Sequence, residues 1–89
     1  MKHRYLEVTF RRGRPLAAYL YLPRPPHAKS ARTEDAGSGL RVDYDEHGTP
    51  LGIEITAPTA VTVAQMNALL AGLGMSAVGP EDLAPLHAA

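Results

Sequence analysis

The feature that most restricts the fold of this chain is a two-residue alternation of apolar and polar side chains in its first 56 residues. In residues 5–11, Leu6, Val8 and Phe10 alternate with Tyr, Glu and Thr. Successive side chains of a β-strand point to opposite faces, so the alternation predicts strands with one buried face. The pattern recurs in residues 16–22, 40–45 and 51–56. We therefore expect an antiparallel sheet with one solvated face.

Turn residues set the expected ends of these strands. The first strand is predicted from His3 to Arg11, because Gly13 can take the positive φ of a tight turn. Proline has no N–H for a ladder, so Pro15 places the start of the second strand at Leu16. Residues 29–36 follow a proline cluster and are polar, which predicts an exposed edge strand. The turn of the last hairpin is predicted at residues 45–48, which read Asp-Glu-His-Gly.

The periodicity becomes helical after Thr62, a residue suited to cap a helix N-terminus. A helix is predicted over residues 62–73, with Gly72 or Gly74 as its stop signal. Pro80 predicts a short helical turn within residues 80–89, and the last residues of this segment are expected to fray.

Together these elements predict one α+β domain over residues 1–89. It consists of an antiparallel β-meander of four to five strands in residues 1–56, with one C-terminal helix packed on one face. The predicted core consists of Leu6, Val8, Leu20, Leu22, Val42, Ile53, Ile55, Met66, Leu69 and Leu70.

The amino-acid composition excludes several kinds of functional site. The chain has no cysteine, which excludes disulfides, thiolate metal ligands and a thiol nucleophile. Its charged start and the lack of an 18-residue apolar run argue against a signal peptide and a membrane span, so a cytoplasmic location is expected. No cofactor is expected.

The formal net charge is zero, yet the charges are segregated along the chain. Eight of the nine Lys and Arg residues lie within residues 2–32, and Arg41 is the only one after Thr33. We expect cross-strand pairing between the two halves, at about 0.2 to 1 kcal/mol a pair. An alternative is weak nucleic-acid binding through Arg11, Arg12 and Arg14, which the acidic second half disfavours.

Four runs carry a resemblance to a known family. They read YLYL at residues 19–22, ARTE at 31–34, VDYDEHG at 42–48 and LGIEI at 51–55. Together they resemble the small bacterial domain of unknown function 2283 family. The resemblance implies no established activity. Some members of this family look like proteins whose genes lie next to those of small toxin-like proteins. The resemblance therefore implies, as one hypothesis, an antitoxin-like role that neutralises such a partner.

The residues that could carry chemistry fit catalysis and metal binding poorly. Residues 43–54 nearly match a calcium-loop pattern from Asp43 to Glu54, but both flanks alternate as strands instead of helices. The histidines show no metal-ligand spacing, and no serine lies in a nucleophile elbow. We predict no catalytic or metal-binding residues, and a small enzyme or metal binder centred on Asp43–Glu54 is the weaker alternative. The histidines and serines considered are His3, His27, His47, His87, Ser30, Ser38 and Ser76.

One helix can cover only one face of the sheet, so the other face and the edge strand are left for a partner. The predicted interface consists of Tyr19, Tyr21, Arg32 and Glu34. The predicted function is a non-catalytic protein-interaction module that forms a homodimer or binds a small protein. Nucleic acid, membrane and small-molecule partners are not expected.

Overall fold

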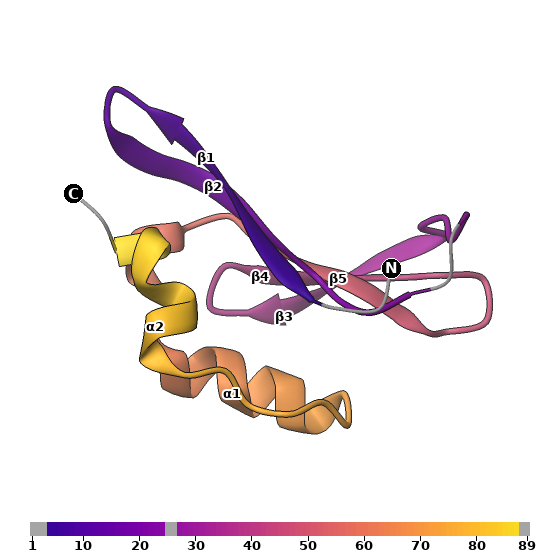
Figure 1. Cartoon of the computed structure of the whole chain (residues 1–89). Coiled ribbons are helices and arrows are strands. Elements are labelled where there is room, and N and C mark those ends of the chain that lie inside the picture. Colours follow the sequence, from indigo (N-terminus) through magenta and orange to yellow (C-terminus); the bar gives the residue numbers. More distant parts are fainter. Residues whose placement is uncertain (1–3, 25–26, 88–89) are drawn as a thin grey trace.

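The computed structural model describes residues 4–24 and 27–87, which form a five-stranded antiparallel sheet with a helical layer on one side (Figure 1). This confirms the predicted α+β class. Among the helices of these residues, none combines the length and apolar character needed to cross a bilayer. The strands are β1 (Tyr5–Arg11), β2 (Arg14–Tyr21), β3 (Arg32–Gly37), β4 (Leu40–Tyr44) and β5 (Pro50–Ile55), and the helices are η1 (Pro58–Ala60), α1 (Val63–Gly72), α2 (Pro80–Leu83) and η2 (Ala84–His87).

The strand order is β1-β2-β5-β4-β3, which is not the order of a simple meander. Strands β3, β4 and β5 are consecutive neighbours, but β2 pairs with β5, so β2 to β5 form a Greek key. The predicted meander order is therefore wrong at one step, because the chain crosses to the far edge of the sheet between β2 and β3. The pairing of Leu20 with Ile53 unites two strands of high apolar content at the centre.

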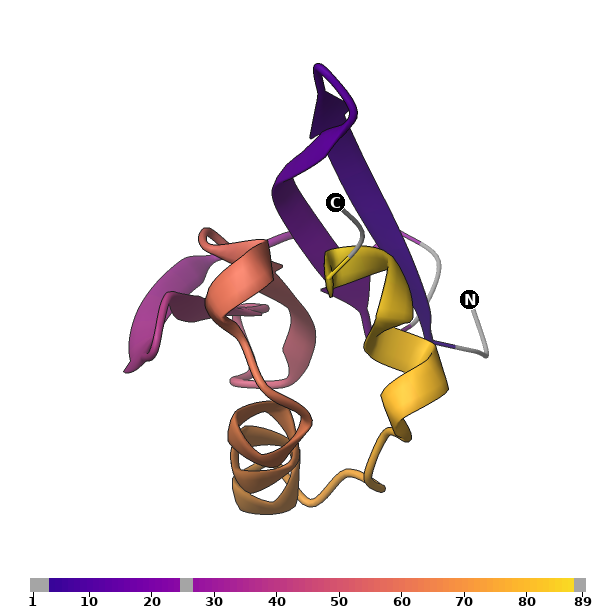
Figure 2. The same ribbon diagram turned by 90° about the vertical axis from the view of Figure 1, so that its left-hand side faces the viewer.

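The core lies between the sheet and the helical layer (Figure 2). Of the predicted core residues, Leu6, Val8 and Leu69 are only partly buried. Leu86 is fully buried, so residues 84–87 take part in the core. The last residues, 88–89, where fraying was expected, lie outside the described part. The buried apolar residues of this cluster are Ala18, Leu20, Leu22, Leu40, Val42, Ile53, Ile55, Val61, Met66, Leu70, Val78, Leu83 and Leu86.

The first hairpin departs from prediction near its turn. Strand β2 begins at Arg14 instead of Leu16, and a register shift after Thr9 places Pro15 opposite Phe10. Pro15 is buried, while Leu16 points outward and is 53% exposed, so the predicted core face is wrong at Leu16. The extra residue of a β-bulge reverses the alternation in this way. The predicted start of β1 at His3 lies outside the described residues.

The helix α1 starts as predicted. The Thr62 hydroxyl accepts a hydrogen bond from the Gln65 backbone N–H, and the Gln65 side chain accepts one from the Thr62 N–H, which forms a capping box. After α1, Asn67 exchanges two hydrogen bonds with the Val78 backbone at 2.8 and 3.0 Å. The Arg4 guanidinium donates to the carbonyls of residues 76 and 77, so the segment before α2 is fixed to the start of β1.

Candidate interaction surface

We call the sheet face opposite the helices the outer face. A row of residues in register crosses it through all five strands. Its middle member is a glycine, so the row has a gap on β5 that a neighbouring side chain can fill. From β1 to β3 the row reads Tyr5, Tyr21, Gly52, Asp43 and Thr33.

Tyr19 fills this gap by lying over Gly52. A Cβ atom at Gly52 would overlap the Tyr19 ring, so only glycine allows this crossing. The Tyr19 hydroxyl donates to Asp43 Oδ2 at 2.7 Å, and the Thr33 hydroxyl donates to Asp43 Oδ1 at 2.5 Å. Burial raises the pKa of Tyr19, and the hydrogen bond to the Asp43 carboxylate raises it further. The contact ties β2, β5, β4 and β3 together.

Tyr5, Tyr21 and Tyr19 form what we call the tyrosine ladder. The Tyr5 and Tyr21 rings stack at 4.4 Å with an interplanar angle of 14°, and the Tyr19 and Tyr21 rings lie 4.7 Å apart at 55°. The Arg24 guanidinium lies 5.1 Å from the Tyr21 ring. Burial raises the pKa of Tyr21, with a further contribution from the Glu7 carboxylate. The ladder is thus a fixed aromatic surface, and Tyr5 is 49% exposed at its end.

The two other predicted interface residues lie elsewhere. Arg32 and Glu34 form an ion pair of 2.7 Å on β3, and the Arg32 guanidinium lies 4.3 Å from the Tyr44 ring. Their strand partners are Tyr44 and Val42, and Val42 is a core residue. Arg32 and Glu34 therefore lie on the helix side of the edge strand. Tyr19 and Tyr21 lie on the outer face, so the four residues occupy opposite sides of the sheet.

The carboxylates from Asp43 to Glu54 do not converge. Asp43 is paired with Gly52 in the sheet, and its carboxylate already accepts two hydroxyl groups. Asp45 Oδ1 accepts the N–H groups of His47 and Thr49, and these bonds lower its pKa, with Thr49 as the largest cause. Within the described residues, no three His, Asp or Glu side chains are grouped to hold a metal ion.

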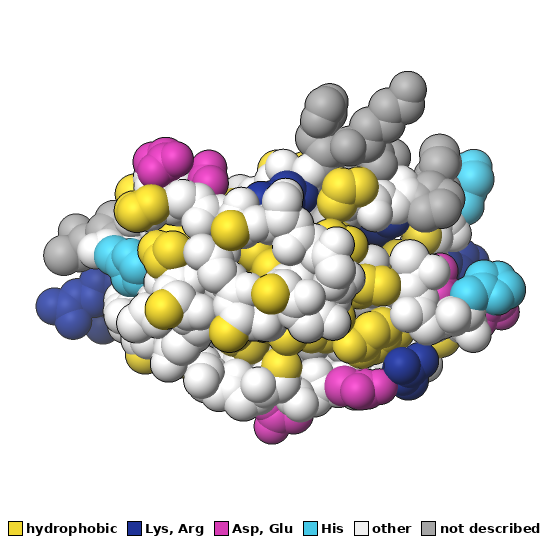
Figure 3. Space-filling view, turned by 90° about the horizontal axis from the view of Figure 1, so that it is seen from below, with side chains coloured by type: hydrophobic (Ala, Val, Ile, Leu, Met, Phe, Trp, Pro, Cys, Tyr) yellow, Lys and Arg dark blue, Asp and Glu magenta, His cyan; other side chains and the backbone are white. Residues whose placement is uncertain are grey.

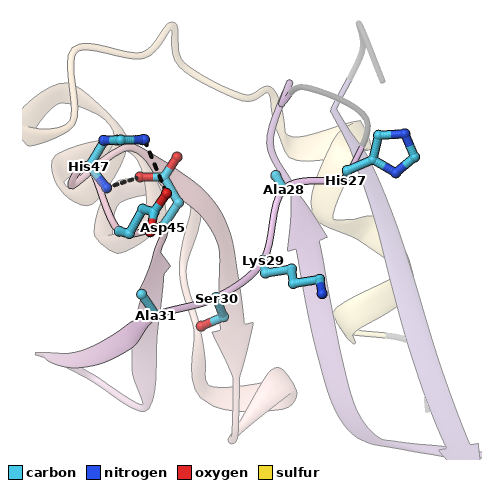
Figure 4. Close-up of a pocket in the computed structure, with 8 residues that line it drawn as sticks. His27, Ala28, Lys29, Ser30, Ala31, Asp45 and His47 are labelled. Atoms are coloured by element: carbon cyan, nitrogen blue, oxygen red, sulfur yellow. Dashed lines mark hydrogen bonds and ion pairs between the residues drawn. The ribbon is translucent and has the colours of Figure 1, made fainter.

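An open groove of about 600 Å³ lies between residues 27–31 and 45–47 (Figure 4). His27 points away from the Asp45 turn, and Asp45 is hydrogen-bonded within that turn. The groove therefore brings no acid and base together across its width. His87 lies apart from it, with Nε2 2.6 Å from the Val61 carbonyl oxygen, and His3 is outside the described residues.

The arginines at the tip of the first hairpin remain together. Arg11 and Arg14 are direct cross-strand partners, and with Arg12 and Leu16 they line a hollow of about 530 Å³. Basic side chains gather at this end of the molecule (Figure 3). Among the described residues, the ion pairs join near neighbours, Arg32 with Glu34 and His47 with Glu46. Neither of these two pairs joins two strands, so the predicted cross-strand pairing between the basic and acidic halves stays a prediction.

The sequence indicated that Tyr19 and Tyr21 share an outer face, but it did not reveal the role of Gly52 or Asp43. The available signal was a glycine inside a strand between two large apolar residues, Leu51 and Ile53. Such a glycine often marks a close approach by another group.

Comparison with known proteins gives one match. No curated protein and no solved structure matches the chain. Tyr19, Thr33, Asp43 and Gly52 all lie in the segment that does match. Residues 17–57, which include most of β2 and all of β3, β4 and β5, match the model of the family described as protein of unknown function (DUF2283), as the resemblance predicted.

Proposed function

We propose that this chain is a cytoplasmic, non-catalytic protein-interaction module that binds a small basic protein on its outer face. The observation that carries the proposal is the tyrosine ladder on a face that the helical layer leaves open. Stacked tyrosines lose little conformational entropy on binding and bury much apolar area, which makes them effective anchors in interfaces.

The charges of the outer face favour a basic partner. In register, Glu7, Tyr19, Glu54, Arg41 and Asp35 form the row next to that of Tyr5 and Tyr21, so three acids of this row accompany one cation. Arg24 over the Tyr21 ring adds a second cation, and Asp43 adds a fourth acid. Complementary charge raises association rates and selects among partners. An acidic, aromatic surface on a small module fits the neutralisation of a basic partner.

The carboxylates support a non-catalytic role. On the outer face, Asp43 accepts two hydrogen bonds that hold the strands in position. Glu54 lies in the next row, beside Arg41. A general acid or base must lie within hydrogen-bonding distance of a bound substrate. Asp43 and Glu54 instead lie on an open sheet face. We therefore assign the polar cluster to the architecture of the binding surface.

The test begins with affinity capture from the native cell extract, followed by calorimetric titration of the purified partner. Tyr5→Ala should weaken binding at least about tenfold, because it removes the exposed end of the ladder. Thr9→Ala, on the same face of β1, should leave the affinity within about twofold. Equal affinity of both variants contradicts the proposal. Capture of RNA or DNA that is lost when Arg11, Arg12 and Arg14 become Ser also contradicts it.

A further inference from the structure

The two edges of the sheet differ in chemistry. The β3 edge carries Arg32, Glu34 and Asp35 in a strand of six exposed residues, a composition that discourages pairing with another strand. The β1 edge has the sequence YLEVTFR, with only two charged residues in seven. Among the described elements, β2 is the only one that packs extensively against β1. The β1 edge is therefore the one suited to accept a further strand.

The first hairpin also extends beyond the rest of the sheet. Only residues 18–21 of β2 pair with β5, so residues 14–17 and the end of β1 form a two-stranded ribbon (Figures 1 and 2). Phe10 and Leu16 on this ribbon are 50% and 53% exposed. A two-stranded ribbon is marginally stable in water by itself. Phe10 lies on the edge strand of this ribbon, where a further strand paired with β1 would cover it.

We propose that a second copy of this chain pairs with β1, antiparallel and edge to edge, about a two-fold axis at Thr9. Glu7 of each copy then lies opposite Arg11 of the other, and Val8 lies opposite Phe10. These cross-strand pairs are the kind that stabilise a sheet, and each occurs twice because the interface is symmetric. The half-exposed Phe10 gains an apolar neighbour, and Arg11 gains an acid.

The alternation of β1 fits this register. Residues paired about Thr9 have the same parity, so apolar side chains meet on the helix side and charged side chains meet on the outer face. A register centred on Val8 would instead place Glu7 opposite Thr9 and leave its charge unmatched. The pairing joins two sheets into one of ten strands, with both helical layers on the same side.

This interface is separate from the proposed function, because it uses the edge of β1 and not the tyrosine ladder on the outer face. A chain that stays monomeric but binds its partner overturns the dimer alone. A dimer with no further partner overturns the proposed function alone.

Crosslinking tests the register directly. The chain contains no cysteine, so Thr9→Cys introduces one thiol at the proposed axis. Directly opposed Cβ atoms in a sheet lie close enough for a disulfide, so oxidation should convert most of the protein to a covalent dimer. The control Tyr5→Cys, whose thiol would face Gly13 of the second copy, should form no covalent dimer. Equal crosslinking of both variants, or of neither, overturns the proposal.

A charge exchange between Glu7 and Arg11 tests the proposed cross-strand pairs without a covalent crosslink. By sedimentation equilibrium, the wild type should change from 9.5 kDa to twice that mass with rising concentration. Glu7→Lys and Arg11→Glu should each weaken self-association at least about tenfold, and the double variant should recover most of it. Circular dichroism confirms that each variant is folded. A wild type that remains at 9.5 kDa at millimolar concentration, or a double variant no better than the singles, overturns the proposal.

Discussion

A single missing side chain shapes the outer face of this protein. Gly52 leaves the space in which the Tyr19 ring crosses β5, and the crossing brings the Tyr19 hydroxyl to Asp43 on β4. The carboxylate in turn accepts the hydroxyl of Thr33 on the edge strand. One glycine thus permits a side-chain connection between strands that backbone pairing joins only through their neighbours.

Gly52→Ala should destabilise the fold by about 1 to 3 kcal/mol, because the new methyl group displaces the Tyr19 ring. Urea unfolding followed by circular dichroism measures this difference. The control is Gly72→Ala at the end of α1, where an added Cβ meets no atom within 4 Å. That variant should be unchanged or more stable by up to about 1 kcal/mol. Similar effects at both positions would contradict the role given to Gly52.

Tyr19→Phe should remove part of the pH dependence of stability at alkaline pH. Burial and Asp43 raise the pKa of Tyr19 above its usual value of 10.0. The unfolded chain therefore loses this proton first, so the free energy of unfolding falls as the pH rises above about 10. Below that pH the contribution is fully present, and Tyr19→Phe should cost about 1 kcal/mol at pH 7. Urea unfolding from pH 7 to 11 tests this. An unchanged alkaline slope in the variant would contradict it.

At the scale of elements, local patterns predicted what depends on local sequence. The alternation identified the regions of β1, β2, β4 and β5, and the polar composition of residues 29–36 identified the edge strand β3. Thr62 marked the start of α1 because its capping box involves residues only three apart. The bulge at Pro15 and Leu16 was missed, since a proline that ends a strand and one that enters a bulge look alike in sequence. The β2 and β5 pairing depends on contacts more than thirty residues apart, which periodicity does not encode.

For the candidate interaction surface, too, the sequence predicted what depends on local pattern and not what depends on strand order. The parity of β2 placed Tyr19 and Tyr21 on the outer face, as the register confirms. Arg32 and Glu34 were grouped with them because all four were expected to be exposed, but parity on β3 directs these two toward the helix side. The distance between the pairs follows from the strand order, which places β5 and β4 between β2 and β3.

At the scale of the whole molecule, the C-terminal segment closes the core. Leu83 and Leu86 are buried, and the His87 ring contacts the Val61 carbonyl oxygen. Arg4 and Asn67 hold the preceding segment to β1 and α1. The segment from Pro80 to His87 is therefore part of the layer that covers the sheet.

Alanine substitutions of two leucines, which should differ widely in their effects on stability, test this arrangement. Leu86→Ala should cost about 3 kcal/mol, because it leaves a cavity at a fully buried site. Leu16→Ala should change the free energy of unfolding by less than about 0.5 kcal/mol, because Leu16 is 53% exposed on the projecting ribbon. Urea unfolding at low protein concentration compares the two in the monomer. If the larger loss occurs at Leu16, the sequence alternation describes the first hairpin correctly and the C-terminal turn does not complete the core.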